Sequence, residues 1–168
     1  MLSMLTAEGC AGRRARLWQR LPEPCDALII TTPESLTYLA NYVQSPFVFN
    51  SAEACAALVL WPDRAVLIGD NLTQPFLDQA HVDEVVCLDW YTGRKSAPLR
   101  RAVVVDAVAD QFAGKLVRRL GIESLSIVSA PANRECNLDS VLRQLRRTKD
   151  DDELAAGEES PSRDSSGA

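Results

Sequence analysis

The chain has 168 residues, 46% of them hydrophobic, and a formal net charge of −5. This length suits a single domain that buries roughly two-thirds of the surface its unfolded chain exposes. Seven acidic residues and one arginine lie from Asp150 onward, so residues 1–149 are nearly neutral. Charge therefore gives no reason to expect a nucleic-acid or a membrane partner.

The start of the chain carries signals for a helix, a strand and a second helix, in that order. Residues 12–21 suit a short amphipathic helix that ends at Pro22. Residues 25–31 are a continuous apolar run, which is typical of a buried strand. Residues 32–34, Thr-Pro-Glu, then predict a helix start, because a hydroxyl N-cap, a first-turn proline and an acidic residue all suit a helix N-terminus.

The middle of the chain reads as a loop followed by a hairpin. Residues 44–53 are expected to form the loop, and residues 54–61 and 64–69 two strands joined by a Pro-Asp turn. A short helix ending near Ala80 and a strand at residues 82–88 are expected next.

The last part of the fold contains a long segment with apolar residues at helical spacing up to Leu120, closed by Gly121 as the C-cap. Its beginning is ambiguous, because residues 102–105 equally suit a strand. Residues 124–129 are expected to form a last strand, and residues 138–145 a final amphipathic helix. Strands and helices thus alternate around one hairpin, which predicts an α/β fold with a mixed β-sheet flanked by helices.

The composition divides the chain into two regions. Residues 12–149 are expected to form the domain, and residues 150–168 an acidic, mostly disordered tail. The cysteines are odd in number, widely separated and without a Cys-x-x-Cys pair: Cys10, Cys25, Cys55, Cys87 and Cys136. Reduced, mostly buried thiols in a cytoplasmic protein are therefore expected. No run approaches the ~20 apolar residues of a membrane span, and no apolar signal core opens the chain.

Candidates for catalysis are scarce. His81 is the only histidine, whereas a hydrolytic metal centre needs several ligands that converge on one point. Asp106 and Asp110 are four residues apart on one predicted helix face, but two solvated acids are the favoured interpretation. The sequence has no Gly-x-Ser-x-Gly nucleophile motif, and the turn after the first predicted strand lacks the glycines of a phosphate site. We expect no catalytic residue, metal site or cofactor.

A basic stretch is the one feature that suggests nucleic acid. Twelve Lys or Arg residues and five acidic ones lie between Arg94 and Lys149. Four cations crowd the polar side of the last predicted helix, so contact with RNA or DNA is one hypothesis; they are Arg143, Arg146, Arg147 and Lys149. Cations at a helix C-terminus, offset by the acidic run after them, are the favoured alternative. No nucleic-acid partner is therefore expected.

Two distant segments resemble the creatinase, prolidase and aminopeptidase P family. Residues 26–39, Asp-Ala-Leu-Ile-Ile-Thr-Thr-Pro-Glu-Ser-Leu-Thr-Tyr-Leu, resemble the stretch that opens the N-terminal domain of that family. Residues 145–154, Leu-Arg-Arg-Thr-Lys-Asp-Asp-Asp-Glu-Leu, resemble the joint that leads into its catalytic domain. The hairpin fits the same order, and the resemblance covers residues 12–154. It departs at residues 40–42, Ala-Asn-Tyr, where the family usually has Thr-Gly-Phe.

The resemblance implies a creatinase N-terminal-like fold with a ribonuclease H-like motif. The family's pita-bread catalytic domain, in which two Asp, one His and two Glu hold two divalent metals, has no counterpart in this sequence. The resemblance thus implies that the acidic tail is the start of a linker to an absent catalytic domain.

The role implied for such a domain is subunit association, or shaping the entrance to a catalytic site. Tyr42, Phe47 and Phe49 are the candidate interface, because exposed aromatic residues are typical interface anchors; equally, these rings cap the local core. We expect a non-catalytic domain that forms a homo-oligomer or associates with a full-length relative. The alternative is a truncated, inactive N-terminal fragment of an Xaa-Pro aminopeptidase or dipeptidase. An RNA-associated module is a third, weaker hypothesis.

Overall fold

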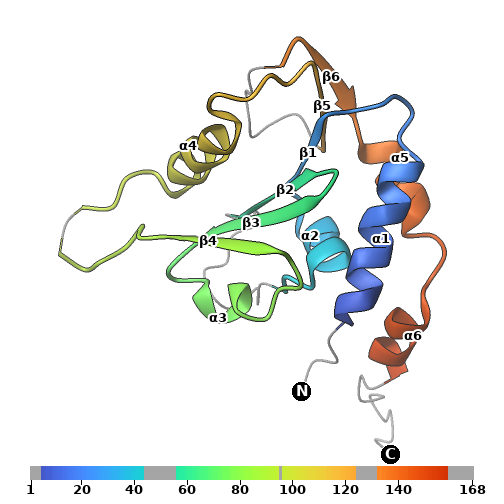
Figure 1. Cartoon of the computed structure of the whole chain (residues 1–168). Helices are drawn as coiled ribbons and strands as arrows, with labels where there is room; N and C mark the ends of the chain where they lie inside the picture. Colours follow the sequence, from blue (N-terminus) through green and yellow to red (C-terminus); the bar gives the residue numbers. More distant parts are fainter. Residues whose placement is uncertain (1–4, 44–55, 95, 124–131, 159–168) are drawn as a thin grey trace, which may run out of the picture.

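The computed structural model describes residues 5–43, 56–94, 96–123 and 132–158. These residues contain one six-stranded mixed sheet with the strand order β4-β3-β2-β1-β5-β6 (Figure 1). The strands are β1 Ala27–Ile30, β2 Ala57–Trp61, β3 Arg64–Asp70, β4 Glu84–Leu88, β5 Arg119–Ile122 and β6 Arg134–Asn137. β2 is antiparallel to both β1 and β3, whereas β3–β4, β1–β5 and β5–β6 are parallel pairs.

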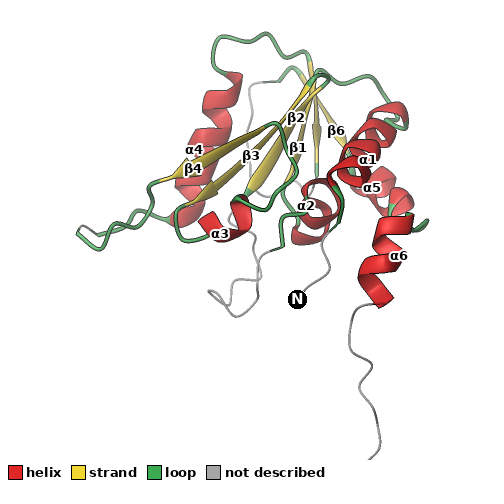
Figure 2. Ribbon diagram, turned by 60° about the horizontal axis from the view of Figure 1, so that its bottom comes forward, coloured by secondary structure: helices red, strands yellow, loops and turns green. Residues whose placement is uncertain are grey.

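Helices cover both faces of this sheet (Figure 2). They are α1 Ala7–Gln19, α2 Pro33–Ala40, α3 Gln74–Leu77, α4 Arg100–Phe112, α5 Asp139–Leu145 and α6 Asp151–Glu158. α1, α2 and α5 pack on one face through a cluster that includes Leu17, Leu36 and Leu142. α4 packs on the other face through Val104 and Val108. The predicted α/β class, with a mixed sheet flanked by helices, is confirmed.

The central strand β1 shows why its sequence is apolar at every position. Leu28 and Ile30 belong to the cluster under α1, α2 and α5, whereas Ala27 and Ile29 belong to the cluster under α4. Successive side chains of a strand point to opposite faces, so a strand covered on both faces needs apolar residues throughout.

Local signals set both ends of α2. Thr32 is the N-cap, and its side-chain oxygen accepts a hydrogen bond from Ser35 N at 3.4 Å. Asn41 closes the helix with a φ of 54°, and its N–H donates to Thr37 O at 2.8 Å. Asparagine tolerates this left-handed conformation, so the turn forms although glycine is absent there.

The long helix predicted up to Leu120 is wrong in its second half. α4 ends at Phe112, and the chain turns at Gly114, which has a φ of 72°. Gly121 lies inside β5, where a Cβ atom would come within 2.5 Å of Leu28 Cδ2. The glycine therefore permits close packing in the sheet and is not a helix cap. Residues 102–105 are helical.

Three further boundaries differ from the prediction. α1 begins at Ala7 and not at residue 12, because Thr6 Oγ1 accepts a hydrogen bond from Gly9 N at 3.0 Å and caps the helix. β6 was not predicted, and the strand expected at residues 124–129 lies outside the described residues. Residues 151–158, placed in a mostly disordered tail, form α6.

The described cysteines are less buried than predicted. They are free thiols, of which Cys10 is buried, Cys25 and Cys136 are half-buried, and Cys87 is exposed. The longest helices in the described ranges, α1 and α4, have 13 residues each. No helix there reaches the length and apolarity of a membrane span.

Candidate interaction surface

The residues singled out by chemistry do not gather into one site. Asp106 and Asp110 are exposed on α4, and His81 Nε2 lies 2.8 Å from Leu5 O. Across the four described ranges, no group of three or more His, Cys, Asp or Glu side chains is placed to hold a metal ion.

Of the three residues of the candidate interface, Tyr42 is the one that the structure describes. Tyr42 is 1% exposed and belongs to the core cluster under α1, α2 and α5. Phe47 and Phe49 lie outside the described residues. Tyr42 therefore packs inside its own chain, and an interface at the loop that follows it stays a prediction.

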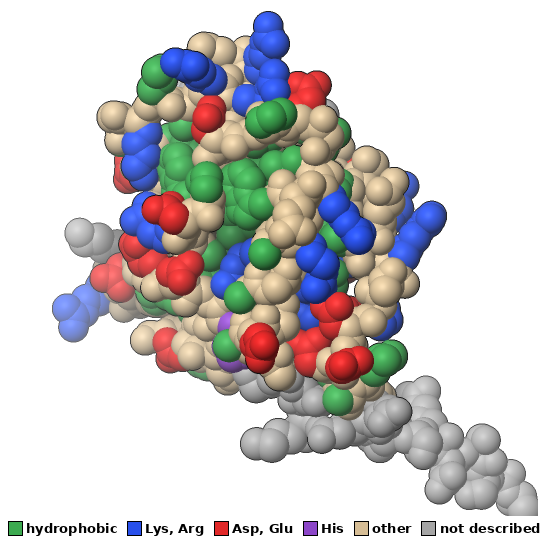
Figure 3. Space-filling view, turned by 45° about the vertical axis from the view of Figure 1, so that its right-hand side comes forward, with side chains coloured by type: hydrophobic (Ala, Val, Ile, Leu, Met, Phe, Trp, Pro, Cys, Tyr) green, Lys and Arg blue, Asp and Glu red, His purple; other side chains and the backbone are tan. Residues whose placement is uncertain are grey.

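An apolar hollow lies between α1 and the β2–β3 hairpin, on the face shown in Figure 3. Its volume is about 210 Å³, less than that of most drug-sized ligand sites. The lining residues are Ala11, Arg14, Ala15, Trp18, Leu60, Trp61, Pro62, Asp63, Arg64, Ala65 and Asp83. The size suits a side chain of another protein better than a cofactor.

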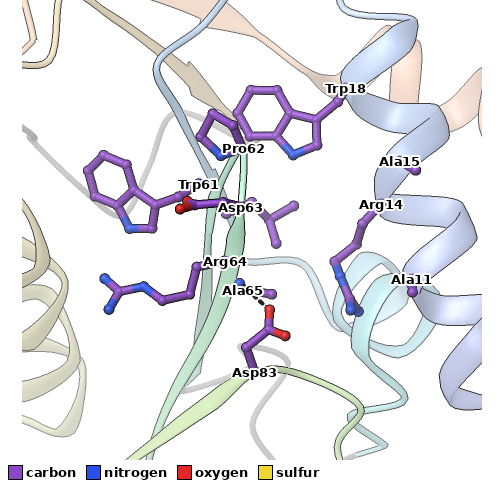
Figure 4. A pocket seen from close by; sticks show the side chains of 11 residues that line it. Ala11, Arg14, Ala15, Trp18, Trp61, Pro62, Asp63, Arg64, Ala65 and Asp83 are labelled. Carbon is purple, nitrogen blue, oxygen red and sulfur yellow. Dashed lines mark hydrogen bonds between the residues drawn. The ribbon is translucent and has the colours of Figure 1, made fainter.

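The sequence of α1 explains why the hollow is open. Ala11, Ala15 and Trp18 follow one another at helical spacing and face the hairpin. Both alanines are exposed, because so short a side chain does not reach the neighbouring strand. Figure 4 shows Trp18 pointing from α1 towards Pro62 at one end of the gap.

The hairpin supplies the floor of the hollow. Leu60 and Ala65 are cross-strand partners in β2 and β3 and belong to the cluster under α1. Trp61 and Arg64 point away from α1 (Figure 4), and Trp61 packs against Phe112 of α4 at a centroid distance of 5.2 Å. The floor of the hollow is thus apolar. Trp61 and Arg64, the next residues along the two strands, point to the other face of the sheet.

Charges of opposite sign border the hollow on its two sides. Arg14 lies on the α1 side, where its Nη1 donates to Leu39 O at 2.7 Å and to His81 O at 2.8 Å. On the hairpin side, Asp63, Asp83 and Glu84 are exposed. Asp83 Oδ2 also accepts a hydrogen bond from Ala65 N at 2.7 Å. Arg64 of β3 pairs with Glu84 at 3.3 Å, which leaves Asp63 and Asp83 on the hairpin side. The surface therefore carries a cation on the α1 flank and is net acidic on the hairpin flank.

A second feature fixes α6 to α1. Arg13 is fully buried; its Nε donates to Tyr38 O at 2.7 Å, and its guanidinium lies 5.1 Å from the centroid of the Tyr38 ring. Its two terminal nitrogens donate to the two oxygens of Asp152 at 2.8 and 3.0 Å. Arg13 also contacts Asp150 at 3.2 Å. The acidic segment is thus held by an arginine more than a hundred residues earlier.

Asp152 also joins the starts of the two helices. Its Oδ2 accepts hydrogen bonds from Thr6 N at 3.0 Å and from Thr6 Oγ1 at 3.1 Å. A Cβ atom on Gly9 would lie 2.1 Å from the same oxygen, so any larger residue there would displace the carboxylate. The hydrogen bond from Arg13 is the main cause that lowers the pKa of Asp152 to about 2, and the Thr6 N–H lowers it further. We name this cluster of Thr6, Arg13, Asp150 and Asp152 the α1–α6 clamp.

The clamp predicts a pH dependence of stability. A carboxyl whose pKa is lowered in the folded state stabilises the fold above its unfolded pKa of about 4, and the effect is lost as pH falls through about 2. We expect Asp152→Asn to cost about 2 kcal/mol of unfolding free energy at pH 7. The difference from the wild type should shrink between pH 4 and pH 2. Urea unfolding at both ends of this range measures it, and a constant difference would contradict the assignment.

A buried carboxylate occupies the N-terminus of α2. Glu123 follows β5 and is 3% exposed. Its Oε2 accepts from Thr31 N and Thr32 N, each at 3.0 Å, and its Oε1 accepts from Thr32 Oγ1 at 2.8 Å. The Ser35 hydroxyl donates to the same Oε1. Helix N-termini behind parallel strands bind phosphates in many α/β proteins, but here the chain's own carboxylate takes that place.

Sequence reasoning missed both the hollow and the clamp. The arginines of residues 12–21 were interpreted as a polar helix face, yet Arg13 is buried. The only local signal was the spacing of Ala11, Ala15 and Trp18, which leaves one stripe of α1 short of large side chains.

Solved structures share this fold. The chain superposes on an Xaa-Pro dipeptidase from Bacillus anthracis with a TM-score of 0.61, 21% identity and 87% of this chain covered. For the prolidase from Pyrococcus horikoshii the values are 0.56, 17% and 88%. For a Creatine_N superfamily domain of a dipeptidase from Streptococcus thermophilus they are 0.53, 12% and 82%.

An α/β domain of this architecture is thus a known building block of Xaa-Pro peptidases. This chain has the creatinase N-terminal-like fold, as its sequence predicted. It spans 38% and 37% of the two peptidase chains and 98% of the Streptococcus domain. No protein-family profile and no curated protein matches the sequence significantly.

Proposed function

We propose that this chain acts by association as a non-catalytic domain, and that two copies meet through the hollow beside α1. The observation that carries the proposal is the hollow itself, an apolar depression between a basic and an acidic flank. Trp18, which lines the hollow, is only partly buried against the core beneath it. A second copy that covers this face would remove its remaining apolar surface from water.

The occupant is a second copy because the charges are self-complementary. In a twofold interface each residue pair occurs twice, so the α1 side of one copy faces the hairpin side of the other. Arg14 would then lie near Asp63 and Asp83 of the partner copy, and the same pairs would form on the other side of the axis. Such complementarity favours this partner and this orientation. The exposed alanines of α1 leave room for close approach.

This proposal is tested by filling the hollow. We expect Ala15→Glu to weaken self-association at least tenfold, because a long side chain would enter the contact and its negative charge would face the acidic hairpin side of the other copy. Sedimentation velocity over a range of concentrations measures the dissociation constant.

Ala109→Glu is the matched control, since Ala109 is exposed on α4, which covers the opposite face of the sheet. It should associate like the wild type, and circular dichroism should show all three proteins folded. A wild type that stays monomeric at every concentration, or an Ala15→Glu variant that associates normally, would refute the proposal.

A second candidate function is favoured by the coverage of the peptidase structures. Because this chain spans 38% and 37% of two peptidase chains, it also suits the role of a front segment of an Xaa-Pro peptidase. In that role the α1–α6 clamp would fix the direction in which the chain continues. Reading the genomic sequence beyond codon 168 in all three frames tests this candidate. Codons for the Asp, Asp, His, Glu and Glu metal ligands of the catalytic domain would support it, and their absence would exclude it.

A further inference from the structure

A hollow lined by three arginines lies at the end of the sheet where β1, β5 and β6 begin (Figure 1). Its volume is about 580 Å³, which is within the range of ligand pockets. The lining residues are Pro24, Asp26, Leu116, Arg118, Arg119, Asn133 and Arg134. None of them lines the hollow beside α1. We name this second depression the arginine hollow.

Strand pairing brings the arginines together. Arg119 and Arg134 are partners in register on β5 and β6, and Arg134 N donates a hydrogen bond to Arg118 O at 3.2 Å. Side chains of partners in register lie on the same face of a sheet. Like charges side by side on neighbouring strands repel each other, so an anion bound between these side chains would offset the repulsion.

Acidic residues of the chain itself compensate only part of this positive charge. Arg119 pairs with Glu23 at 3.0 Å, and Asp26 Oδ2 accepts hydrogen bonds from Arg118 N at 2.7 Å and Arg119 N at 2.9 Å. The guanidinium groups of Arg118 and Arg134 form no ion pair or hydrogen bond with another described residue. Both of these arginines are exposed, so two cations are left for an external anion.

The surroundings of the arginines favour the carboxylates of a peptide over a phosphate or a nucleotide. Phosphate sites rely on free backbone N–H groups, whereas the N–H groups of Arg118 and Arg119 already bind Asp26. Among the described residues that line the arginine hollow, none is aromatic and able to stack a base. Leu116 is 77% exposed, and Pro24 is exposed beside it in the lining. Apolar contacts next to cations suit a peptide that carries both acidic and apolar side chains.

We propose that the arginine hollow is the docking site of an acidic peptide segment of another protein. Arg118 and Arg134 bind two carboxylates of that segment, since guanidinium and carboxylate groups form charge-assisted hydrogen bonds. Leu116 and Pro24 contact an apolar side chain between the two carboxylates. These contacts are at the surface, so the affinity is modest and falls as salt screens the charges.

Fluorescence polarisation of a labelled peptide with the full chain tests the proposal. The probe is fluorescein-labelled Glu-Glu-Leu-Glu-Glu, and its control is the uncharged peptide Gln-Gln-Leu-Gln-Gln with the same label. We expect saturable binding of the acidic probe with a dissociation constant below about 1 mM, and binding at least tenfold weaker for the glutamine probe. Raising NaCl from about 0.05 M to about 0.3 M should weaken the binding of the acidic probe.

Arg134→Glu is the decisive variant, because it places a carboxylate where a carboxylate of the peptide would bind. It should weaken binding of the acidic probe at least tenfold, and Arg118→Glu should act in the same direction. Arg94→Glu is the matched control, because Arg94 is exposed in the loop after β4, at the opposite edge of the sheet. It changes the net charge by the same amount and should leave the dissociation constant within about twofold of the wild type. Since the three arginines are exposed, all variants should keep the circular dichroism spectrum of the wild type.

Several results would overturn the proposal. The acidic probe would fail to bind at about 1 mM, or the glutamine probe would bind equally well. Equal weakening by Arg94→Glu and Arg134→Glu would indicate attraction to the net charge and no defined site. Displacement of the probe by inorganic phosphate but not by free glutamate, at constant ionic strength, would assign the hollow to a phosphate. Ala15→Glu should bind the probe like the wild type, so this proposal and the proposed contact between two copies are tested separately.

Discussion

Replacing Arg13 with methionine is expected to lower the free energy of unfolding by about 3 kcal/mol, the lower end of the cost of breaking a buried ion pair from one side. Arg13 is fully buried, whereas the side chains of Asp150 and Asp152 are 29% and 12% exposed. Methionine fills a similar volume, so little of the loss would come from a cavity. The main cost is that both carboxylates, and the carbonyl of Tyr38, lose the hydrogen bonds from Arg13.

Arg16→Met is the matched control for this prediction. Arg16 also contacts Asp150, but its side chain is 38% exposed, and exposed ion pairs contribute between 0 and about 1 kcal/mol. Urea unfolding monitored by circular dichroism gives both values at pH 7. Equal losses of unfolding free energy for the two variants would show that the burial of Arg13 does not strengthen its ion pairs.

Gly9→Ala tests the clamp without removing a charge. Its new Cβ would lie 2.1 Å from Asp152 Oδ2, so the carboxylate must move away from Thr6 and Arg13. A stability loss in the same direction as that of Arg13→Met would tie the effect to the geometry of the clamp. If Gly9→Ala is neutral, α6 is free to shift, and the clamp does not fix its direction.

The α1–α6 clamp could not be predicted from the sequence. Arg13 lies 139 residues before Asp152, and no local pattern connects them. Arg13 lies one helical turn before Leu17, but the charged head of an arginine on a helix is expected to reach water. Only the docking of α6 on α1 buries it. The same docking gives order to residues 151–158, whose composition is acidic and whose own apolar face is weak.

Elements with local signals were predicted well. β1 is a short apolar run between a proline-containing turn and a helix cap, and α2 carries its N-cap, its first-turn proline and its closing asparagine within ten residues. The hairpin of β2 and β3 is likewise set by its own turn. In each case the residues that determine the element are neighbours in the sequence, and tertiary packing favours the same structure.

The error after Phe112 has a different cause. Leu116 and Leu120 continue the helical spacing of α4, so periodicity alone extends the helix. In the structure Leu116 is 77% exposed and Leu120 fully buried. The turn at Gly114 ends the helix, and β5 forms because Leu120 pairs with β1 and not because of its own propensity. Spacing could not distinguish these two outcomes.

Replacing Glu123 with alanine is the second change with a large expected effect, again about 3 kcal/mol of unfolding free energy. The carboxylate is the acceptor for two backbone N–H groups, those of Thr31 and Thr32. Hydrogen bonds to a charged group are stronger than neutral ones, and buried donors left without a partner lose their full solvation. The carboxylate also joins β5 to the start of α2, so the loss should appear in global unfolding.

Glu34→Ala is the control, because Glu34 lies in the first turn of the same helix but is exposed. Its interaction with the helix dipole contributes at most about 1 kcal/mol. Glu123→Gln separates charge from hydrogen bonding. One amide oxygen can still accept from the backbone N–H groups of Thr31 and Thr32, and the hydroxyl of Thr32 can turn to accept from the amide nitrogen.

The glutamine variant should therefore lose about 1 kcal/mol of unfolding free energy, well below the loss of Glu123→Ala. Urea unfolding of the three variants at pH 7 gives the order. If Glu123→Gln is as unstable as Glu123→Ala, the negative charge itself holds the helix start. If Glu123→Ala costs no more than Glu34→Ala, the buried carboxylate is dispensable, and another group must satisfy the N-terminus of α2.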